Sequence, residues 1–257
     1  MKSALTLTFH KINAAPTQFK SIPNSAADRY AITSSLFEQV LNMIPCKKCC
    51  TVSNYVEEQD GNWLILTFDD GNLSDFEIAF PMMREKGIKA TFFINPLNIG
   101  LSGYSTGAHL KEMAREGMEI GSHGLTHRYL ITMEQDEAIR EIRESKDKLE
   151  QIIGVRVFSF APVGGHYRKW MKETAYEAGY KVFATMVPGT TNGGGDFLLL
   201  KRNHIQSQHD ADYLLRLIGG DYGTLTINRL RYNLLQIPKI ILGINNYDLL
   251  KKYLFGH

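Results

Sequence analysis

The sequence has few cysteines, no excess of charge of either sign and no apolar run long enough to span a membrane. Its 257 residues include 3 cysteines, and 29 Lys and Arg residues stand against 27 Asp and Glu residues. Without a basic stripe interleaved with aromatic residues, this balance gives no reason to expect nucleic acid as a partner. No transmembrane segment is expected, because no stretch approaches the length of a membrane-spanning helix. Internal repeats, low-complexity stretches and linkers are also missing, so one domain with a sizeable core is expected.

The three cysteines, Cys46, Cys49 and Cys50, lie together in the segment PCKKCC. Cys46 and Cys49 have the CxxC spacing of a zinc-binding pair. No second pair of Cys or His residues stands nearby to complete a tetrahedral site. Reduced thiols without a structural metal are therefore expected.

The N-terminal segment MKSALTLTFHKI lacks the apolar centre of a secretory signal peptide, because Thr6, Thr8, His10 and Lys11 interrupt it. A cytoplasmic location is the expectation that follows.

Short apolar runs alternate with helical patterns along the chain. We predict strands over residues 4–9, 63–68, 90–94, 118–121, 155–160, 180–184 and 197–200, and helices over residues 33–44, 75–86, 108–115, 134–153, 169–178 and 211–218. This alternation predicts parallel strands joined by crossover helices. The number and length of the strands favour an α/β fold of the deformed (β/α) barrel type, with about seven parallel strands. In such barrels the chemistry lies at the carboxyl ends of the strands.

The C-terminal tail has a different composition, rich in Leu and Ile with scattered Lys and Arg. We therefore predict a barrel over residues 1–225 and a helical extension over residues 226–257, broken at Pro238 and packed on the barrel. A peripheral membrane contact is the alternative for such a basic, amphipathic segment. Packing against the protein is favoured.

Two adjacent aspartates, Asp69 and Asp70, follow the apolar run WLILTF, which ends at Gly71. Burying neighbouring carboxylates costs free energy unless a positive charge offsets them. His123 and His127, four residues apart after another predicted strand, place both imidazoles on one face of a helical turn. A His, His, Asp set with an open position is typical of a catalytic divalent metal such as Zn²⁺. The ion would offset the second aspartate, which could then take a proton from a metal-bound water.

The segments TFDDG and SHGLTH resemble the first two motifs of the polysaccharide deacetylases, carbohydrate esterase family 4, which have the nodulation-protein B homology fold. The fragments KATFFIN, APVGG, AGYKVFAT and LKRN support this resemblance. It implies a deformed (β/α) barrel and metal-dependent removal of an acetyl group from an N-acetylated sugar. Carried over by position, Asp69 would be the general base, and Asp70, His123 and His127 the metal ligands. Gly124 stands where the family usually has Ser or Thr.

The third motif of that family usually reads Arg-Pro-Pro-Tyr-Gly, and the corresponding segment here is FAPVG. Phe160 replaces the arginine that normally steadies the base. Val163 replaces the tyrosine whose backbone N–H helps to bind the oxyanion, and that N–H is retained. Pro162, Val163 and Gly164 are therefore candidate substrate-binding residues.

The missing arginine leaves open which residue steadies Asp69. Arg202 follows the strand predicted over residues 197–200 and could approach from that strand, and Arg168 is a second candidate. A solvated surface position is the alternative for both. Arg202 and His204, in the segment KRNHIQS, complete the set of candidate substrate-binding residues.

The leaving amine needs a proton from a general acid. His10 ends the first predicted strand, and its position resembles the biofilm poly-N-acetylglucosamine deacetylases, whose circularly permuted barrel brings the late His motif ahead of the aspartate pair. Residues 30–37 resemble the segment that follows in that branch. His10 is therefore the predicted acid, with His204 as the second candidate, and His209 is expected to be solvated. A histidine that merely caps a strand end is the alternative.

These residues predict a metal-dependent hydrolase that removes an acetyl group from an N-acetylated sugar of a glycan or glycan precursor. Its cofactor would be one divalent metal, Zn²⁺ or another transition metal. A carbohydrate-binding protein on an inactive deacetylase scaffold is one alternative, and a hydrolase of another non-peptide C–N bond is a second. The complete Asp, Asp, His, His set favours the enzyme, because a binding protein has no need of a costly metal site. Polymeric, lipid-linked and nucleotide-linked sugars all stay open as substrates.

Overall fold

The computed structural model describes residues 1–14, 29–44, 48–57, 61–243, 246–247, 249–250 and 253. Its strands are β1 (Lys2–Phe9), β2 (Lys11–Asn13), β3 (Ala31–Thr33), β4 (Lys48–Cys50), β5 (Gly61–Asp70), β6 (Thr91–Ile94), β7 (Glu119–Ser122), β8 (Ser159–Phe160), β9 (Val182–Ala184), β10 (Thr190–Asn192), β11 (Leu198–Leu200) and β12 (Asn203–His204). Its α-helices are α2 (Ser34–Met43), α3 (Val52–Glu57), α4 (Phe80–Glu85), α5 (Gly107–Arg115), α6 (Gln135–Ile153), α7 (Lys169–Glu177), α8 (Ala211–Gly219) and α9 (Tyr222–Leu242). A π-helical turn (Asp75–Ala79) and short 3₁₀ turns (Pro96–Asn98, Leu130–Thr132, Val163–Gly165) complete the elements.

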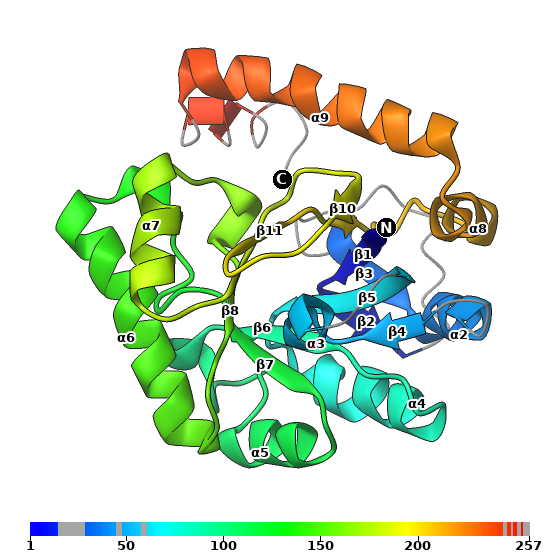
Figure 1. The fold of residues 1–257 in the computed structure, drawn as a ribbon, viewed down its shortest axis with the longest axis horizontal. Coiled ribbons are helices and arrows are strands. Elements are labelled where there is room, and N and C mark those ends of the chain that lie inside the picture. The colour runs from blue at the N-terminus through cyan, green and yellow to red at the C-terminus, as the bar shows by residue number, and fades with distance from the viewer. Residues whose placement is uncertain are drawn as a thin grey trace.

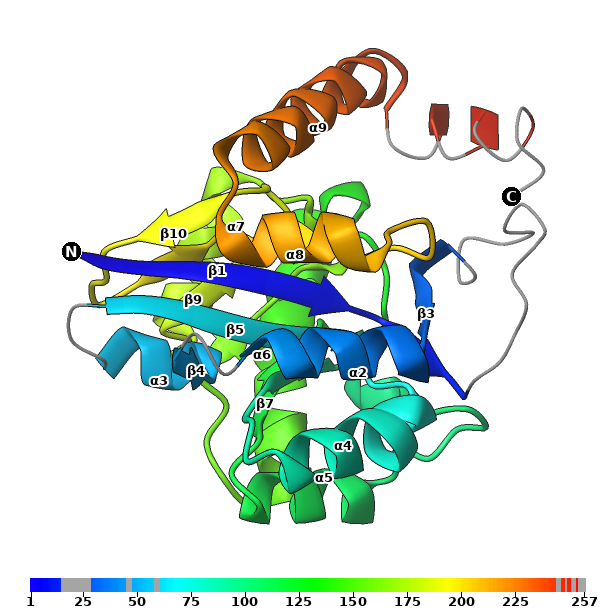
Figure 2. The ribbon, with the colours of Figure 1, turned by 90° about the vertical axis from the view of Figure 1, so that its right-hand side faces the viewer.

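Ten of the strands form one sheet in the order β10-β1-β5-β6-β7-β8-β9-β11, with β12 beside β1 and β4 beside β5. In this order, every neighbouring pair of strands from β1 to β11 is parallel, whereas β10 is antiparallel to β1. After β11 the chain crosses to β12, which pairs with β1, so the sheet curls into a nearly closed barrel. Helices surround this barrel (Figure 1), and in Figure 2 β1 and β5 run between α8 and α2. The predicted deformed (β/α) barrel is confirmed.

Most predicted elements occur within a few residues of the expected bounds, and the differences concern short elements, among them the helix α3 and the strands β2 and β3, which were not predicted. The strand predicted over residues 155–160 is reduced to Ser159–Phe160. The short strands β4, β10 and β12 were not predicted, because three residues carry too little periodicity to distinguish a strand from a loop. Each becomes a strand by pairing with β1 or β5.

The cysteine segment lies partly within the described structure. Cys49 and Cys50 belong to β4, and neither forms a disulfide. Burial raises the pKa of Cys49 to about 12, so its thiol is protonated at neutral pH. Cys46, the other half of the CxxC spacing, lies outside the described residues.

Alternation along the strands divides the core into two parts. Leu64, Leu66 and Phe68 point toward the helices, whereas Trp63 and Ile65 belong to a second cluster on the opposite face of the sheet. Between sheet and helices, aromatic rings stack across three neighbouring strands. The ring centroid of Phe68 lies 5.2 Å from that of Phe9 and 4.7 Å from that of Phe92. These contacts fix the strands whose ends carry the polar residues.

The last helix, α9, lies outside the sheet, above β10 and α8 in both views (Figures 1 and 2). It begins at Tyr222, before the extension predicted from residue 226, and continues through Pro238, so the predicted break at this proline is wrong. Pro238 has no backbone N–H, so the carbonyl of Leu234 receives no hydrogen bond from it. Leu234 is exposed, and water can donate to this carbonyl instead. Asn228 donates a 2.8 Å hydrogen bond to the Tyr213 hydroxyl on α8.

The opposite side of α9 is apolar and exposed. Its exposed apolar residues recur at helical spacing: Ile227, Leu230, Leu234, Ile237 and Ile241. No helix in the described part of the chain is both long enough and apolar enough to cross a membrane. The peripheral membrane contact stays a prediction.

We expect Phe68→Ala to lower the free energy of unfolding by about 3–5 kcal/mol, because it removes a buried ring from the centre of the aromatic stack and leaves a cavity. Val155→Ala, at a half-exposed loop position, is the control and should change it by less than about 0.5 kcal/mol. Urea denaturation of both variants measures the difference. A Phe68→Ala cost as small as that of the control would contradict this account of the core.

Candidate active site

The carboxyl ends of the parallel strands meet in one region because the strands pair in register. The pairing of β1 with β5 runs to Phe9 opposite Phe68. His10 and Asp69, the next residues, therefore stand at neighbouring strand ends. His123 follows directly after β7, two strands away from β5. The structure thus brings the N-terminal histidine, the aspartate pair and the histidine motif to one end of the barrel, as the sequence predicted.

Asp70, His123 and His127 gather their donor atoms at one point. The Nε2 atoms of His127 and His123 lie 2.8 Å and 3.5 Å from Oδ1 of Asp70, and one donor atom of each residue lies within 4.8 Å of the others. Nδ1 of His123 lies 2.7 Å from the carbonyl oxygen of Ala161. Because a carbonyl only accepts, Nδ1 carries a proton, and Nε2 is the nitrogen that faces Asp70 and that a metal would bind in place of a proton. This donor set fits a divalent transition metal.

Two of these residues have unusual backbone conformations. Asp70 has φ +78° and His127 has φ +59°, and among the described residues they are the only positions with positive φ other than glycines. Side chains other than glycine adopt this region at a cost of order 1–3 kcal/mol unless the surroundings impose it. The fold therefore imposes the conformation at both positions, which aims both side chains at the same point.

Glu141, on α6, holds the loop that carries His127. Its carboxylate accepts hydrogen bonds from the backbone N–H groups of Leu125 and Thr126, at 2.7 Å and 3.0 Å, and from the Thr126 hydroxyl at 2.6 Å. The glutamate is 4% exposed. Glu141 was not predicted from the sequence. The signal that could have indicated it is an acidic residue within the apolar stripe of α6, next to Ile142.

Asp69 forms a buried ion pair with Arg202. Nη1 of Arg202 lies 2.6 Å from Oδ1 of Asp69, and both side chains are almost fully buried. Nε of Arg202 donates to the carbonyl oxygen of Thr185, and the guanidinium lies 5.1 Å from the centre of the Phe93 ring. Burial raises the pKa of Asp69, but Arg202, His123 and His10 outweigh burial and leave that pKa below its usual value. Asp69 is therefore ionised at neutral pH.

Arg202 thus occupies the role left open by the missing arginine of the third motif. Its guanidinium is buried and contacts the aspartate, and Arg202 also lines the cavity that contains Asp69, so the substrate contact predicted from sequence stays a prediction. The second candidate, Arg168, lies just before α7, where its Nη2 donates to the carbonyl of Ile131 at 3.4 Å. It does not line the cavity that contains Asp69.

His10 and His204 face the same cavity and lie against each other. Their ring centroids are 5.2 Å apart, and Tyr30 stacks on His10 at 4.8 Å. Nε2 of His204 lies 3.0 Å from the sulfur of Met186, whereas Nδ1 of His10 has no hydrogen-bond partner among the described residues. Burial lowers the pKa of both histidines, and His10 together with Arg202 lowers that of His204 further.

The site opens into a cavity of ≈ 800 Å³. Val163 and Gly164, from the altered third motif, line it, whereas Pro162 stands behind them at the start of the 3₁₀ turn. Gly164 has φ +66°, and a Cβ there would lie 2.6 Å from the Tyr129 ring, so glycine is required. His209, which was expected to be solvated, also lines the cavity and is half-buried. The cavity extends from the strand ends to α9, which contributes residues that no motif indicated.

We expect Arg202→Met to lower the free energy of unfolding at pH 7 by about 3–5 kcal/mol, because Asp69 then keeps a buried charge without its partner. Adding Asp69→Asn should recover part of this loss, since the amide carries no charge. Arg84→Met is the control, because it breaks an exposed ion pair with Glu112 that contributes about 0–1 kcal/mol. Urea denaturation measures all four proteins. Equal losses for Arg202→Met and Arg84→Met would refute a buried pair.

Residues 57–183 match the polysaccharide deacetylase family. The peptidoglycan-N-acetylglucosamine deacetylase of Bacillus cereus is 28% identical over 119 residues, which cover 46% of this chain and 54% of that protein. A chitin deacetylase of Pestalotiopsis sp. is 33% identical over 93 residues, which cover 36% of this chain and 31% of that protein. The chain spans about half the length, or less, of these curated relatives.

Solved structures share the fold over most of the chain. The deacetylase PplD of Streptococcus pyogenes superposes with a TM-score of 0.70 at 22% identity, covering 84% of this chain and 98% of that one. IcaB of Ammonifex degensii superposes with a TM-score of 0.69 at 20% identity, covering 85% of this chain and 97% of that one. At these identities the likeness establishes the fold alone. Residues 57–183 therefore match a polysaccharide deacetylase domain, and the solved structures show that its fold extends over most of the chain.

Proposed function

We propose that the chain is a metal-dependent carbohydrate N-deacetylase that hydrolyses the acetamide of an N-acetylated sugar in a glycan or glycan precursor. The observation that carries this proposal is the division of the aspartate pair. Asp70 faces two histidine nitrogens, whereas Asp69 faces Arg202 and stays ionised. One carboxylate is thus available as a ligand and the other as a base, at the wall of a cavity that can hold a sugar.

Asp70, His123 and His127 would hold the metal, and two nitrogens with one carboxylate oxygen suit Zn²⁺ or a similar divalent ion. When bound, the ion supplies a Lewis acid that polarises the acetyl carbonyl and makes water easier to deprotonate. Burial raises the pKa of Asp70, but hydrogen bonds from His123 and His127 outweigh it and hold that pKa well below the usual value. Asp70 is therefore an anion before any metal binds.

Asp69 acts as the general base. Its carboxylate accepts a proton from the attacking water, whose oxygen forms the new bond to the acetyl carbon. The ion pair with Arg202 keeps the carboxylate in one orientation, and Oδ2 of Asp69 lies 4.0 Å from Nε2 of His123. A base fixed in this way does not need to reorganise as the proton moves.

Two further groups complete the reaction. The backbone N–H of Val163, at the cavity wall, donates to the oxygen that becomes negative as the carbonyl is attacked. His10 donates a proton to the sugar nitrogen as the C–N bond breaks, which releases acetate and the free amine. His10 is preferred over His204 because the pKa of His204 is held further below the usual value, by burial and by the nearby His10 and Arg202, so that His10 is the more easily protonated of the two.

The inactive-scaffold alternative depended on the lost arginine of the third motif. Arg202 provides the equivalent positive charge from the connection between β11 and β12 and keeps Asp69 ionised. A retired site has no need of this buried pair, nor of Glu141 holding the His127 loop. We therefore favour the enzyme over the binding protein.

Asp69→Asn should reduce acetate release from N-acetylated sugars by about 10²–10⁴-fold, because the amide cannot accept the proton. Its metal content should stay that of the wild type, since the three ligands are unchanged. Asp147→Asn, at an exposed position on α6, is the control and should leave the rate unchanged. Circular dichroism checks that both variants fold. If the Asp69→Asn variant released acetate at the native rate, Asp69 could not be the general base.

Removal of the divalent metal with a chelator should abolish acetate release, and added Zn²⁺ should restore it. Without the ion, the ligand residues alone polarise the acetyl carbonyl poorly. His127→Ala should show reduced metal content by elemental analysis and no rescue by Zn²⁺. This side chain is 40% exposed, so folding should tolerate the change. Full activity in a chelated, metal-free sample would contradict the proposed metal dependence.

A further inference from the structure

The outer side of α9 carries an apolar stripe along the helix. Its members recur at intervals of three or four residues, which places them on one face: Ile227, Leu230, Leu234, Ile237 and Ile241. Each of these residues is between 53% and 75% exposed. In Figures 1 and 2 α9 forms the upper boundary of the molecule, so the stripe lies on an outward surface and not in a cleft.

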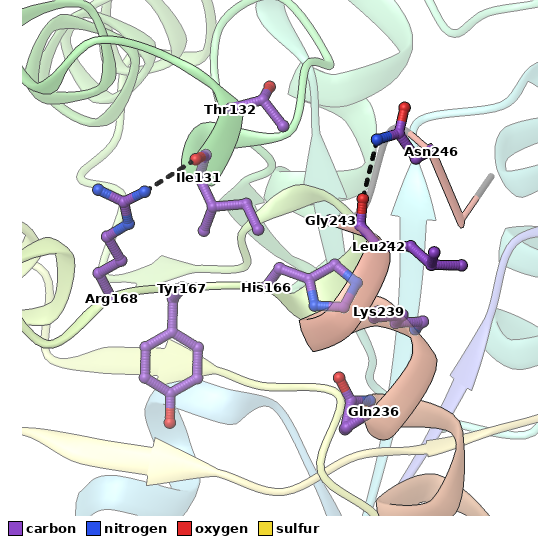
Figure 3. Close-up of a pocket in the computed structure, with 10 residues that line it drawn as sticks. All are labelled: Ile131, Thr132, His166, Tyr167, Arg168, Gln236, Lys239, Leu242, Gly243 and Asn246. Atoms are coloured by element: carbon purple, nitrogen blue, oxygen red, sulfur yellow. Dashed lines mark hydrogen bonds between the residues drawn. The ribbon is translucent and has the colours of Figure 1, made fainter. Parts of the chain in front are cut away.

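The side of α9 that faces the protein is more polar than the side that faces away. Asn228 bonds to Tyr213 on α8, and Gln236 and Lys239 point into a pocket of ≈ 620 Å³ between α9 and the barrel (Figure 3). Among the described apolar residues of α9, Leu225 alone packs against the hydrophobic core. A helix that is held on its own domain by apolar burial has the opposite arrangement. The stripe of α9 is therefore directed toward another apolar surface.

Charge indicates which surface this is. The segment Tyr222–Leu242 contains no Asp or Glu, whereas Arg229 and Arg231 are exposed, and helical geometry puts one of them on each flank of the stripe. Positive charge beside an apolar stripe is attracted to the anionic headgroups of a membrane. A second copy of this chain, docked on the same stripe, would bring like charges together, which disfavours association.

The residues after α9 continue this pattern. Leu249, Leu250 and Tyr253 are 65%, 42% and 87% exposed, and in the sequence Lys251 and Lys252 stand between them. Leucine and tyrosine next to lysine suit a membrane surface, where apolar side chains enter the acyl boundary and ammonium groups stay among the headgroups. The described helices include none that is able to cross a membrane. Contact along the surface is the arrangement that these residues favour.

We propose that the outer side of α9 docks the protein on a membrane that contains anionic lipids, with the helix axis parallel to the surface and the apolar stripe inserted among the headgroups. The barrel does not need to rearrange, because the contacts of Asn228 and Leu225 lie on the other side of the helix. Tyr232 and Leu235 of the same helix line the catalytic cavity. Docking therefore holds that cavity about 10 Å, one helix diameter, from the membrane surface.

Cosedimentation of the full chain with lipid vesicles tests this surface. One set of vesicles contains equimolar phosphatidylglycerol and phosphatidylcholine, and the other contains phosphatidylcholine alone. We expect the protein to bind the anionic vesicles about 10-fold more tightly than the neutral ones, and the difference to shrink as salt screens the headgroups. Equal binding to both vesicles would overturn the role of the arginines.

A leucine variant tests the stripe itself. Leu234→Gln should weaken binding to the anionic vesicles by about 10-fold, because less apolar surface then leaves water. Leu101→Gln is the matched control, since it changes a leucine of similar exposure, 54%, in the loop after β6, and it should bind as the wild type does. Circular dichroism checks that both variants fold. Equal binding by the two variants would overturn the proposal.

An arginine variant tests the charge. Arg229→Gln should weaken binding to the anionic vesicles by about 5-fold and leave binding to the neutral vesicles unchanged. Arg140→Gln makes the same charge change at an exposed position on α6 and is the control. A loss of the same size in both variants would show that net charge, and not the flank of α9, attracts the protein to the vesicles, which contradicts the proposal.

The remaining outcomes separate docking from other occupants and from the proposed reaction. A wild type that stays in the supernatant with both vesicles refutes membrane docking. Sedimentation equilibrium without lipid tests self-association, and a wild-type dimer that Leu234→Gln converts to a monomer would assign the stripe to a second copy instead. Acetate release is measured independently, so protein that binds vesicles but releases no acetate would refute the deacetylase and leave the docking surface intact.

Discussion

The buried pair of Asp69 and Arg202 is the interaction on which the site depends. Each charge alone would be costly to bury, and together they lie 2.6 Å apart with further support from the Thr185 carbonyl. The pair keeps one carboxylate ionised and oriented while its neighbour, Asp70, turns toward His123 and His127. Without it, two adjacent carboxylates would share the same surroundings, and neither would have a distinct role.

Parallel register supplies the second constraint. Because β1, β5 and β7 run in the same direction and end at the same level, residues separated by more than a hundred positions become neighbours. The aromatic stack beneath these ends makes the register rigid, since a slip of one residue would turn the stacked rings to the other face of the sheet. The core thereby fixes the distances on which a metal site and a base depend.

The helix α9 gives the cavity a roof that the barrel does not provide. Its inner side places Arg231 and Lys239 at the wall of the cavity that contains Asp69, and its outer side is apolar and exposed. It lies outside the residues 57–183 that match the family, so the chemistry of the strand ends and the charge of the roof are separate features of this chain. The barrel carries the residues of the reaction that we propose, and α9 adds further residues to the wall of the same cavity.

The sequence by itself determined the alternation of strands and helices, the barrel, and the pairing of the aspartate motif with His123 and His127. Those inferences rest on periodicity and local spacing, which can be recognised in the linear sequence. Tertiary structure alone decided that Arg202 steadies Asp69, that Glu141 holds the His127 loop and that α9 continues through Pro238. Each of these depends on which distant groups meet after folding, because burial and charge pairing are set by neighbours in space and not by neighbours in the chain.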